Sequence, residues 1–395
     1  MMMKIGLVLR GPMSYSLTFI VNEVKVWQEL GFQVIVFAGD NRQQLLLTTP
    51  FTTIAALPLS RYNVKRIVQS IAGIFKVLVL GTIPMVRFLR YELHSGTTLL
   101  QTIKKIYKVA HILPEQLDVI HFGFGNVALG KEYLAKAMKA KMSISFRGSD
   151  IAILPLADPL LYKKAWDNAD KIHVISRYLH QEVIRYGCTN ENKIQLIYQT
   201  LDLEYIKAQP LVKGLSQPLQ LITVARLHWT KGIEYALCTV KSLLLQGLNC
   251  HYTIIGSGEH EWAIRYAMKE LELEDFVSLT GALPYDDVLK RVAVADIYVQ
   301  SSVQEGFCNA VLEAQALGVL TVATDAGGIR ENIEDGYSGW LVPKRNAEAM
   351  AEKIKKIIAL SGEEKEKIKA TAKERIRQTF YLNRYKEDWN RFFSE

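Results

Sequence analysis

The stretch VQSSVQEGFCNAVLEAQALGVLTVATDAGGIREN, residues 299–332, decides the fold. Its first residue ends an apolar run that indicates a buried strand, and a polar loop follows over 301–307. A helix is predicted over 309–317, because Gly318 is a common residue just after a helix end, where it accepts the left-handed conformation. Residues 319–324 are mostly β-branched or apolar, which predicts a second buried strand. This order of elements is typical of an α/β sheet.

Two carboxylates in this stretch are candidates for ligand binding. Glu305 lies in the polar loop, at the carboxyl end of the first strand, where open α/β sheets bind ligands. Glu313 lies one helical turn after Asn309, and a carboxylate is a good acceptor for the two hydroxyls of a ribose. The helix start also offers N–H groups to sugar hydroxyls or an anion. Spacing alone leaves a second interpretation open, in which Glu305 is a solvated loop charge and Glu313 an ordinary helix residue.

The residues around the two carboxylates favour the functional interpretation. The pattern Glu-Gly-Phe-x-Asn-x-x-x-Glu, followed by Asp-x-Gly-Gly-x-x-Glu, resembles the signature of the GT-B glycosyltransferases, specifically glycosyltransferase family four. The Glu-x7-Glu element of that family corresponds to Glu305 and Glu313, and the resemblance continues through Glu331, Gly336 and Gly339. It implies two doubly wound Rossmann-like domains that face each other across a cleft, with a C-terminal helix that crosses back to the first domain.

The resemblance also implies retaining transfer of a sugar from a nucleoside-diphosphate sugar, with UDP-sugar or GDP-sugar as the expected co-substrate and no other cofactor. Arg226 and Lys231 follow a predicted strand over 219–225 and match the family's Arg-x4-Lys-Gly element. Two cations at a strand's carboxyl end can hold a diphosphate and stabilise it as it leaves. A merely charged loop is the alternative. No Asp-x-Asp sequence is present, so a divalent metal has no obvious ligands and we expect no metal site.

Further donor-site residues are expected around these charges. Glu305 and the N–H groups after Gly306 would hold the sugar, and Glu313 would hold the ribose. The Gly-x-Gly turn at 256–258 predicts a nucleotide-contacting loop, but it lacks the third glycine of an NAD fingerprint. The complete set of expected donor-binding residues is Gly11, Gly256, Gly258, Leu283, Gly306, Phe307, Cys308, Asn309 and Glu313.

The first half of the chain matches the family only in outline. His121 ends a predicted strand and is a catalytic candidate, although Gly123 occupies the position of the family's second histidine and a lone strand-end histidine is more often structural. The acceptor-side candidates are Ser14, Arg147 and Asp150. Arg147 would either bind an anionic acceptor or pair with Asp150 as scaffold.

Composition and charge narrow the class of protein. The 395 residues suffice for two domains, and the four scattered cysteines, with no metal-ligand or redox spacing, suit a reducing cytoplasm. The N-terminus resembles a first strand rather than a signal peptide, so we expect a cytoplasmic protein. Residues 1–205 hold 24 Lys and Arg against 15 Asp and Glu, whereas the rest of the chain is nearly balanced. No nucleic-acid motif is present, so an anionic membrane or lipid-phosphate partner is favoured.

Residues 64–90 form a second notable stretch. Twenty residues, 67–86, contain a single charge, Lys76, and basic residues flank both ends. An apolar helix docked on the first domain, a basic helix at the membrane interface, and a membrane span are the three interpretations, in that order of preference. The second interpretation would place the protein on the inner face of the cytoplasmic membrane.

The expected organisation is an acceptor-side domain over 1–205, a linker over 206–218, a donor-binding domain over 219–378, and an aromatic C-terminal helix, 379–395, packed on the first domain. The expected acceptor is a saccharide, and the basic, apolar surface of the first domain favours one carried on a lipid in cell-surface polysaccharide assembly. The alternatives are a soluble-sugar or sugar-phosphate transferase, a nucleotide-sugar epimerase of the same fold, and a non-catalytic donor-binding subunit of a polysaccharide complex.

Overall fold

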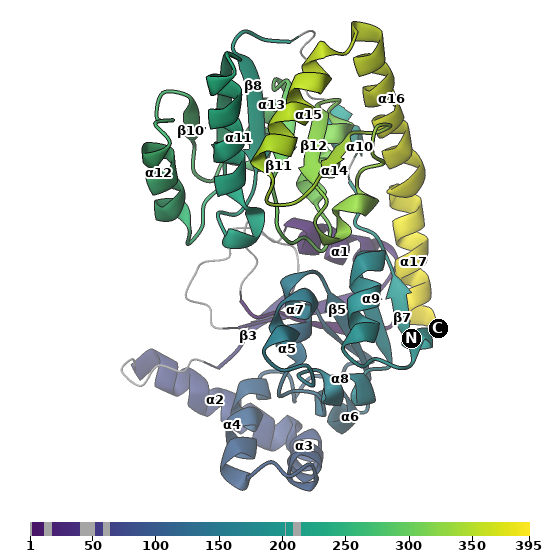
Figure 1. The fold of residues 1–395 in the computed structure, drawn as a ribbon. Coiled ribbons are helices and arrows are strands. Elements are labelled where there is room, and N and C mark those ends of the chain that lie inside the picture. The colour runs from purple at the N-terminus through teal and green to yellow at the C-terminus, as the bar shows by residue number, and fades with distance from the viewer. Residues whose placement is uncertain (1, 12–17, 40–51, 58–63, 202, 208–214) are drawn as a thin grey trace. The chain divides into compact units, whose positions relative to one another are not determined.

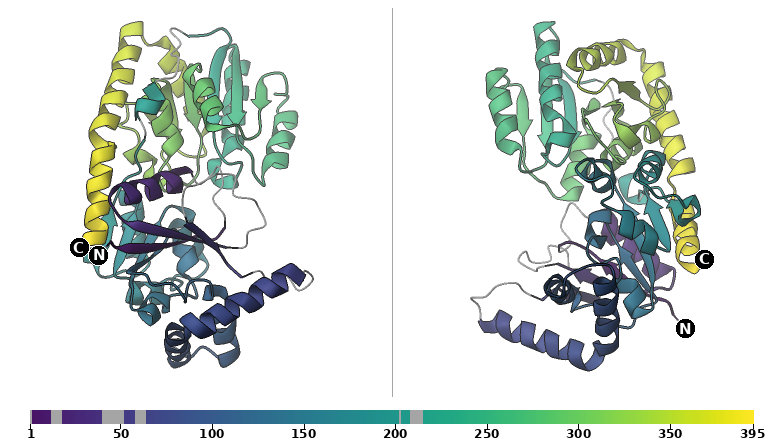
Figure 2. Two further views of the ribbon diagram at one scale, coloured as in Figure 1. Left: turned by 180° about the vertical axis from the view of Figure 1, so that it is seen from behind. Right: turned by 60° about the horizontal axis from the view of Figure 1, so that its bottom comes forward.

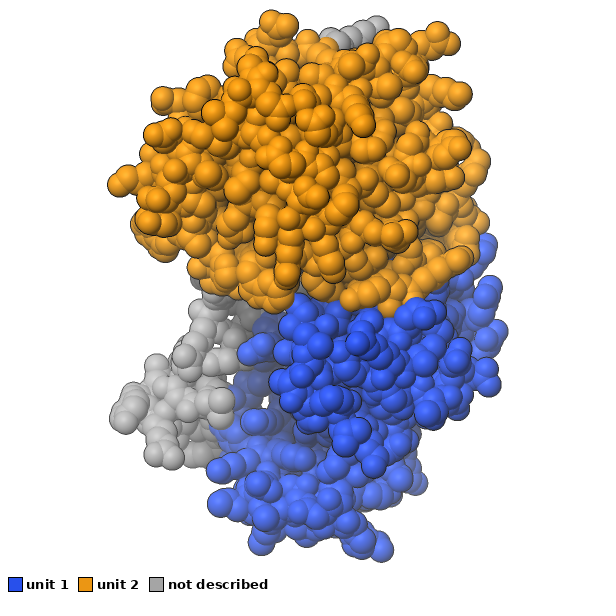
Figure 3. Space-filling model, in the orientation of Figure 1, with its two compact units in different colours: residues 1–175, 179–197, 386–395 blue, residues 176–178, 198–385 orange. Residues whose placement is uncertain are grey.

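The computed structural model describes residues 2–11, 18–39, 52–57, 64–201, 203–207 and 215–395. The chain divides into two compact units, which are described separately below (Figures 1 and 3). Unit 1 consists of Met1–Ile175, Leu179–Ile197 and Lys386–Glu395, and unit 2 of Ser176–Tyr178 and Tyr198–Tyr385.

Unit 1 is built on a parallel sheet with the strand order β3-β2-β1-β4-β5-β6-β7. The first strand, β1, is buried at four of its five positions, as expected for a parallel sheet covered on both faces. It lies between β2 and β4, so that Leu7 is in register with Val36 on one side and His121 on the other. The strands are β1 (Lys4–Val8), β2 (Gln33–Ala38), β3 (Thr52–Ala55), β4 (Val119–Phe122), β5 (Lys141–Phe146), β6 (Lys171–Val174) and β7 (Ile194–Leu196).

The helices of unit 1 cover this sheet and extend beyond it at one end (Figures 1 and 2). They are α1 (Thr18–Glu29), α2 (Val64–Leu80), α3 (Thr82–His94), α4 (Leu99–Val109), α5 (Gly125–Ala128), α6 (Leu134–Met138), α7 (Ser149–Ala152), α8 (Lys163–Asn168) and α9 (Arg177–Arg185).

The apolar stretch 64–90 forms two helices, α2 and α3, which are bent by 91° about Gly81. A Cβ at Gly81 would lie 3.2 Å from the backbone of Leu113, so the glycine permits a tight approach at the bend. Within the described residues, no single helix has the length and apolar composition to cross a membrane. Ala72–Leu80 of α2 and the whole of α3, taken together, meet that criterion, by length and composition only.

Unit 2 repeats the same topology, with the strand order β10-β9-β8-β11-β12-β13. Its strands are β8 (Leu219–Val224), β9 (Cys250–Ile255), β10 (Val277–Leu279), β11 (Ile297–Gln300), β12 (Leu320–Thr324) and β13 (Trp340–Val342). Its helices are α10 (Leu203–Lys207), α11 (Ile233–Leu245), α12 (Glu261–Glu270), α13 (Tyr285–Ala293), α14 (Asn309–Ala316), α15 (Ala347–Ala359) and α16 (Gly362–Thr379). Both units are therefore Rossmann-like and doubly wound, as the sequence predicted.

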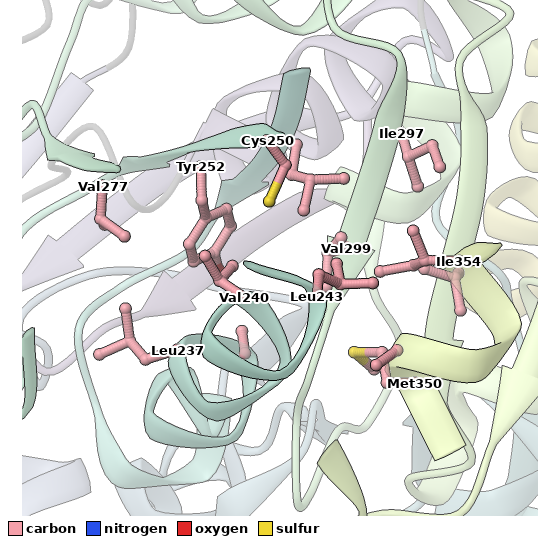
Figure 4. Close-up of a cluster of buried hydrophobic side chains, with 14 of the residues drawn as sticks. Leu237, Val240, Leu243, Cys250, Tyr252, Val277, Ile297, Val299, Met350 and Ile354 are labelled. Atoms are coloured by element: carbon pink, nitrogen blue, oxygen red, sulfur yellow. The ribbon is translucent and has the colours of Figure 1, made fainter. Parts of the chain in front are cut away.

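The core of unit 2 lies between its sheet and the helices α11 and α15 (Figure 4). Apolar side chains recur along α11 at Leu237, Val240 and Leu243, a spacing that places them on one helical face against the sheet. Strand order reverses between β8 and β11. In open α/β sheets this switch point is where ligands bind.

The last helix, α17 (Leu382–Ser394), belongs to both units, because Lys386–Glu395 cluster with unit 1. Trp389 and Phe393 are buried against Trp27 of α1, with ring centroids 4.9 and 5.0 Å away. An ion pair of 2.8 Å joins Lys386 to Glu29. The return of the C-terminal helix to the first domain is thus confirmed.

A short segment, Ser176–Tyr178, belongs to unit 2 although it lies within the first half of the chain. The carboxylate of Glu331 explains this, since it accepts the N–H groups of Arg177 and Tyr178 at 2.8 and 3.0 Å. The units separate after Ile197 rather than at the expected residue 205. Part of the expected linker, 208–214, lies outside the described residues.

Candidate active site

The loops at the switch point of unit 2 carry the charged residues that the sequence singled out. Arg226 and Lys231 lie in the loop after β8, and Glu305 lies in the loop after β11. Gly232 allows the two loops to meet, because a Cβ there would lie 2.5 Å from the carbonyl oxygen of Ser301. Its φ of +55° is also one that side-chain-bearing residues rarely adopt.

Lys231 and Glu305 form an ion pair at this point. The Nζ of Lys231 lies 2.5 Å from Oε1 of Glu305, whose side chain is only 7% exposed. Burial is the largest influence on the pKa of Lys231 and lowers it, but the charge of Glu305 and the hydrogen bond to it act together with other nearby groups and leave this pKa above its usual value. The ammonium group therefore stays charged at neutral pH and compensates the buried carboxylate.

A chain of buried hydrogen bonds leads to the same carboxylate oxygen. Tyr298 Oη donates to Oε1 of Gln300, and Nε2 of Gln300 donates to Oγ of Ser302, each over 2.8 Å. Ser302 Oγ then donates to Glu305 Oε1, also over 2.8 Å. Because the Gln300 amide donates to Ser302, it fixes the Ser302 hydroxyl as a donor to Glu305. Sequence reasoning missed this series of hydrogen bonds, since nothing in the residue order shows which polar strand-end side chains meet.

Glu313 occupies the first turns of α14 and is half-buried. Burial raises its pKa to about 7, although a hydrogen bond of 3.0 Å from Tyr285 Oη opposes the rise. Its protonation state therefore changes near neutral pH. A ligand with hydroxyl donors would favour the ionised form, because only the ionised carboxylate accepts hydrogen bonds on both of its oxygens without donating one.

Arg226 is the second cation of the loop after β8. Its side chain is exposed and makes no ion pair with the residues that the structure describes. The pKa of the neighbouring His228 is lowered mainly by burial of that side chain and next by the positive charge of Arg226. Arg226 is thus an available positive charge close to the partly exposed Lys231, and it also acts to lower the pKa of Lys231.

The glycines at 256 and 258 have a structural explanation. A Cβ at Gly256 would lie 1.9 Å from the carbonyl oxygen of Ala225, and one at Gly258 would lie 2.3 Å from that of Leu227. Both positions need glycine so that the loop after β9 can pack on the loop after β8. Leu283 is half-buried in the loop before α13. Contact of these three residues with a nucleotide stays a prediction.

The segment 306–309 leads into α14, and its side chains are mostly committed to packing. The ring of Phe307 contacts those of Tyr198 and Phe380, with centroids 5.8 and 5.5 Å away. Burial raises the pKa of Cys308 to about 12, so its thiol stays protonated. No side chain caps α14, and Oδ1 of Asn309 is buried without a hydrogen-bond partner among the described residues. The backbone after the buried Gly306 and the Asn309 side chain are therefore the groups of this segment suited to a ligand.

His121 lies in the core of unit 1, which corrects its expected catalytic role. The side chain is fully buried, and its two ring nitrogens are within 2.8 Å of Ser143 Oγ and 2.9 Å of Ser145 Oγ. The rings of Trp27 and Trp389 pack on it. A fully enclosed imidazole with both nitrogens hydrogen-bonded has no access to a substrate.

Arg147 and Asp150 are also committed to the scaffold of unit 1. The guanidinium of Arg147 is buried and pairs with Glu23 over 2.8 Å, and its Nε donates to the carbonyl oxygen of Gly123. The carboxylate of Asp150 instead accepts backbone N–H groups of Gly125, Arg147 and Gly148. The expected pairing of the two side chains with each other is therefore wrong, and neither carries an exposed charge for an acceptor.

The loop after β1 contains the remaining two candidates. Gly11 lies at its start, with open space around the position of a Cβ. Ser14 lies outside the described residues. Binding of donor or acceptor by this loop stays a prediction.

Comparison with known proteins identifies the family. Residues 210–375 match the model of the family described as glycosyl transferases group 1. The amylovoran biosynthesis glycosyltransferase AmsK of Erwinia amylovora is 30% identical over 85% of this chain and 86% of its own. The chain belongs to the group 1 glycosyltransferases. A putative colanic acid biosynthesis glycosyltransferase of Escherichia coli, WcaL, is 28% identical over 96% of both chains.

A solved structure supports the fold of this glycosyltransferase. The complex of Anabaena HepE with UDP-glucose matches 99% of both chains with a TM-score of 0.71, at 15% identity. The GT-B fold and the transferase class expected from the sequence are confirmed. The alternatives of an epimerase and a non-catalytic subunit give way to this assignment, and the narrower placement in family four stays a prediction.

Proposed function

We propose that this glycosyltransferase moves a sugar, with retention of configuration and without a divalent metal, from a UDP-sugar to a lipid-linked saccharide during exopolysaccharide assembly. The observation that carries the proposal is the ion pair of Lys231 with the buried Glu305 at the switch point of unit 2, with Arg226 in the loop of Lys231 and Glu313 in the helix that follows Glu305. The names of AmsK and WcaL favour exopolysaccharide synthesis, and the UDP-glucose bound by HepE favours UDP over GDP.

The donor would bind through groups of complementary charge. Arg226 and Lys231 would contact the diphosphate, and the ammonium of Lys231 has three donors, so it can hold Glu305 and a phosphate oxygen together. The uncapped start of α14 would add N–H groups. Glu313 would accept the ribose hydroxyls, and Glu305 would accept hydroxyls of the sugar.

The transfer then needs stabilisation of the charges that develop on both atoms of the bond that breaks between the sugar and the diphosphate. The bond between the sugar C1 and the diphosphate oxygen breaks, and the acceptor oxygen bonds to C1 on the same face. The acceptor proton passes to a phosphate oxygen of the departing UDP. Arg226 and Lys231 stabilise the negative charge that grows on the diphosphate, and Glu305 offsets positive charge on C1. The hydrogen bond from Ser302 holds Glu305 in place for this task.

Two measurements test the proposal. In thermal shift with UDP, GDP, ADP, TDP and CMP, UDP alone should raise the melting temperature, with or without EDTA. In turnover of UDP-glucose and other UDP-sugars on membrane extract, Glu305→Gln should lose activity at least 100-fold, about the effect of removing one transition-state contact. Glu363→Gln, the same change in the exposed first turn of α16, is the matched control.

Each part of the proposal can fail separately. Loss of turnover in EDTA that Mg²⁺ restores would contradict metal independence, and an inverted anomeric proton signal in the product would contradict retention. Equal transfer to a water-soluble saccharide and to lipid extract would favour a soluble-sugar transferase.

A further inference from the structure

We propose that the surface formed by α2, α3 and α4 docks on an anionic phospholipid bilayer. The inference concerns how the protein reaches a lipid-linked acceptor. It rests on the proposed function only in that such an acceptor explains why the protein would bind a membrane. The three helices follow one another in the chain and lie together at one end of unit 1 (Figures 1 and 2).

The three helices leave a large apolar surface uncovered. Eleven large apolar side chains on them are between 41% and 67% exposed. Soluble domains rarely expose so many on consecutive elements, and such patches mark interaction sites. The residues are Ile74, Phe75, Leu78, Val79 and Leu80 on α2, Ile83, Val86 and Leu93 on α3, and Leu99, Leu100 and Ile103 on α4.

A few contacts attach the helices to the rest of unit 1 and leave the apolar side chains exposed. On α2, Val77 is buried and Lys76 pairs with Glu115 over 2.9 Å, so these contacts attach the helix to the unit. On α3, Phe88 is fully buried. Phe75 and Val79, four residues apart, lie on one face of α2 beside its anchoring residues and stay exposed. The apolar surface is thus held in place by the fold and is not an unfolded segment.

The charge of the protein is concentrated on the same helices. Residues 64–110 contain eight Lys and Arg but one acidic residue, Glu92, so they account for +7 of the net charge of +8. Glu92 is fully buried and pairs with Lys105 over 2.7 Å. Arg90, Lys104 and Lys108 are exposed and make no ion pair with the described residues. Cations beside apolar side chains suit the headgroup and acyl layers of an anionic membrane.

A second copy of the chain fits this surface poorly. A symmetric dimer through these helices would oppose each cation with those of the partner, since such an interface uses the same patch twice. The exposed part of the patch has no acidic side chain within the described residues to compensate them. Like charges across an interface disfavour association, whereas anionic lipid neutralises them.

Vesicle flotation tests the inference. We expect the full chain to float with vesicles of phosphatidylglycerol and phosphatidylcholine, and at least tenfold less with phosphatidylcholine alone or in high salt. Phe75→Ser with Val79→Ser and Leu100→Ser should reduce flotation at least tenfold, as should Arg90→Glu with Lys104→Glu and Lys108→Glu. The matched controls are Leu245→Ser with Trp262→Ser, and Lys356→Glu, which alter exposed residues of unit 2.

A second measurement needs no variant. Hydrogen exchange of the unaltered chain should slow over α2–α4 when phosphatidylglycerol vesicles are added, and not over α11 or α12. No flotation, flotation that the charge variant leaves unchanged, or a dimer in solution that the serine variant dissociates would each overturn the inference. Glu305→Gln should float like the parent protein, so failure of the catalytic proposal is distinguishable from failure of this one.

Discussion

Nζ of Lys231 lies 2.5 Å from Oε1 of Glu305, and this contact joins the loops that follow two different strands, β8 and β11. Each side chain compensates the charge of the other in a site where Glu305 is almost fully buried. In the proposed mechanism, the stability of unit 2 and the transfer of the sugar therefore depend on the same two residues.

Their coupling is measurable by a double-mutant cycle. Lys231→Met should destabilise the protein by about 3 kcal/mol, because it leaves Glu305 buried without its partner. Glu305→Gln should cost less, since Lys231 is partly exposed. In urea unfolding, the double variant should be at least 0.5 kcal/mol more stable than the sum of the single effects predicts, a gap outside the usual scatter of independent sites. Additive effects would contradict a direct ion pair.

Ser302 is expected to position Glu305 for turnover. Ser302→Ala removes a hydrogen bond to a charged group, worth about 1.5–3 kcal/mol, so kcat should fall about 10- to 100-fold with little change in KM. The adjacent Ser301→Ala is the control, because Ser301 is equally buried but donates to the backbone oxygen of Lys231. It should lower the melting temperature similarly and largely preserve kcat. Equal losses of kcat in both variants would indicate a general packing effect.

Donor binding should depend on pH through Glu313. With its pKa raised by burial to about 7, this carboxyl is largely protonated below pH 7 and ionised above it. UDP should therefore bind more tightly as the pH rises through about 7, measured by calorimetry between pH 5.5 and 8.5. In Glu313→Gln, the component of this dependence due to Glu313 should disappear, leaving only the titration of UDP itself.

Tyr285→Phe provides a second check on the same group. The hydrogen bond from Tyr285 lowers the pKa of Glu313, so its removal should move the midpoint to higher pH. A shift to lower pH, or an unchanged dependence in Glu313→Gln, would show that another group controls the titration.

Unit 1 should lose stability in mild acid. Burial lowers the pKa of His173 to about 3 and holds that of His121 well below its usual range. In the unfolded chain both titrate near 6.5, so the unfolded state binds more protons below that pH. The contribution of the two histidines to the free energy of unfolding is fully present above about pH 6.5. It falls as the pH drops, by up to about 1.4 kcal/mol per pH unit for each histidine.

The variant His121→Gln tests this sign. The loss of unfolding free energy between pH 7.5 and 5.5 should be smaller than in the parent chain, because one fewer buried imidazole takes up a proton on unfolding. His94→Gln is the control, since His94 is exposed on α3. An unchanged pH dependence in His121→Gln would contradict a neutral, buried imidazole.

Sequence reasoning located several strands of unit 2 and the charged loops that follow them, because both depend on local patterns. Apolar runs predicted the bounds of β8 and β12 within one residue, and Gly318 predicted the end of α14 within one residue. Arg226, Lys231, Glu305 and Glu313 follow these elements directly, so their approach at one switch point follows from the topology.

The errors concern contacts between distant residues. Glu23 lies 124 positions from Arg147, and nothing local shows that it neutralises the guanidinium. His121 was placed by its position at a strand end, but its enclosure depends on Trp389, near the other end of the chain. The bend at Gly81 was also missed, because the apolar pattern continues through the break between α2 and α3.

One feature of α17 bears on how the protein is made. Residues Lys386–Glu395, which include most of α17, complete the core of unit 1 with Trp389 and Phe393, whereas the rest of that unit ends at Ile197. Domains usually fold in order as they leave the ribosome. Here the N-terminal unit cannot finish folding until the whole of unit 2 has been translated. A premature stop after Tyr385 would therefore damage the half of the protein that was synthesised first.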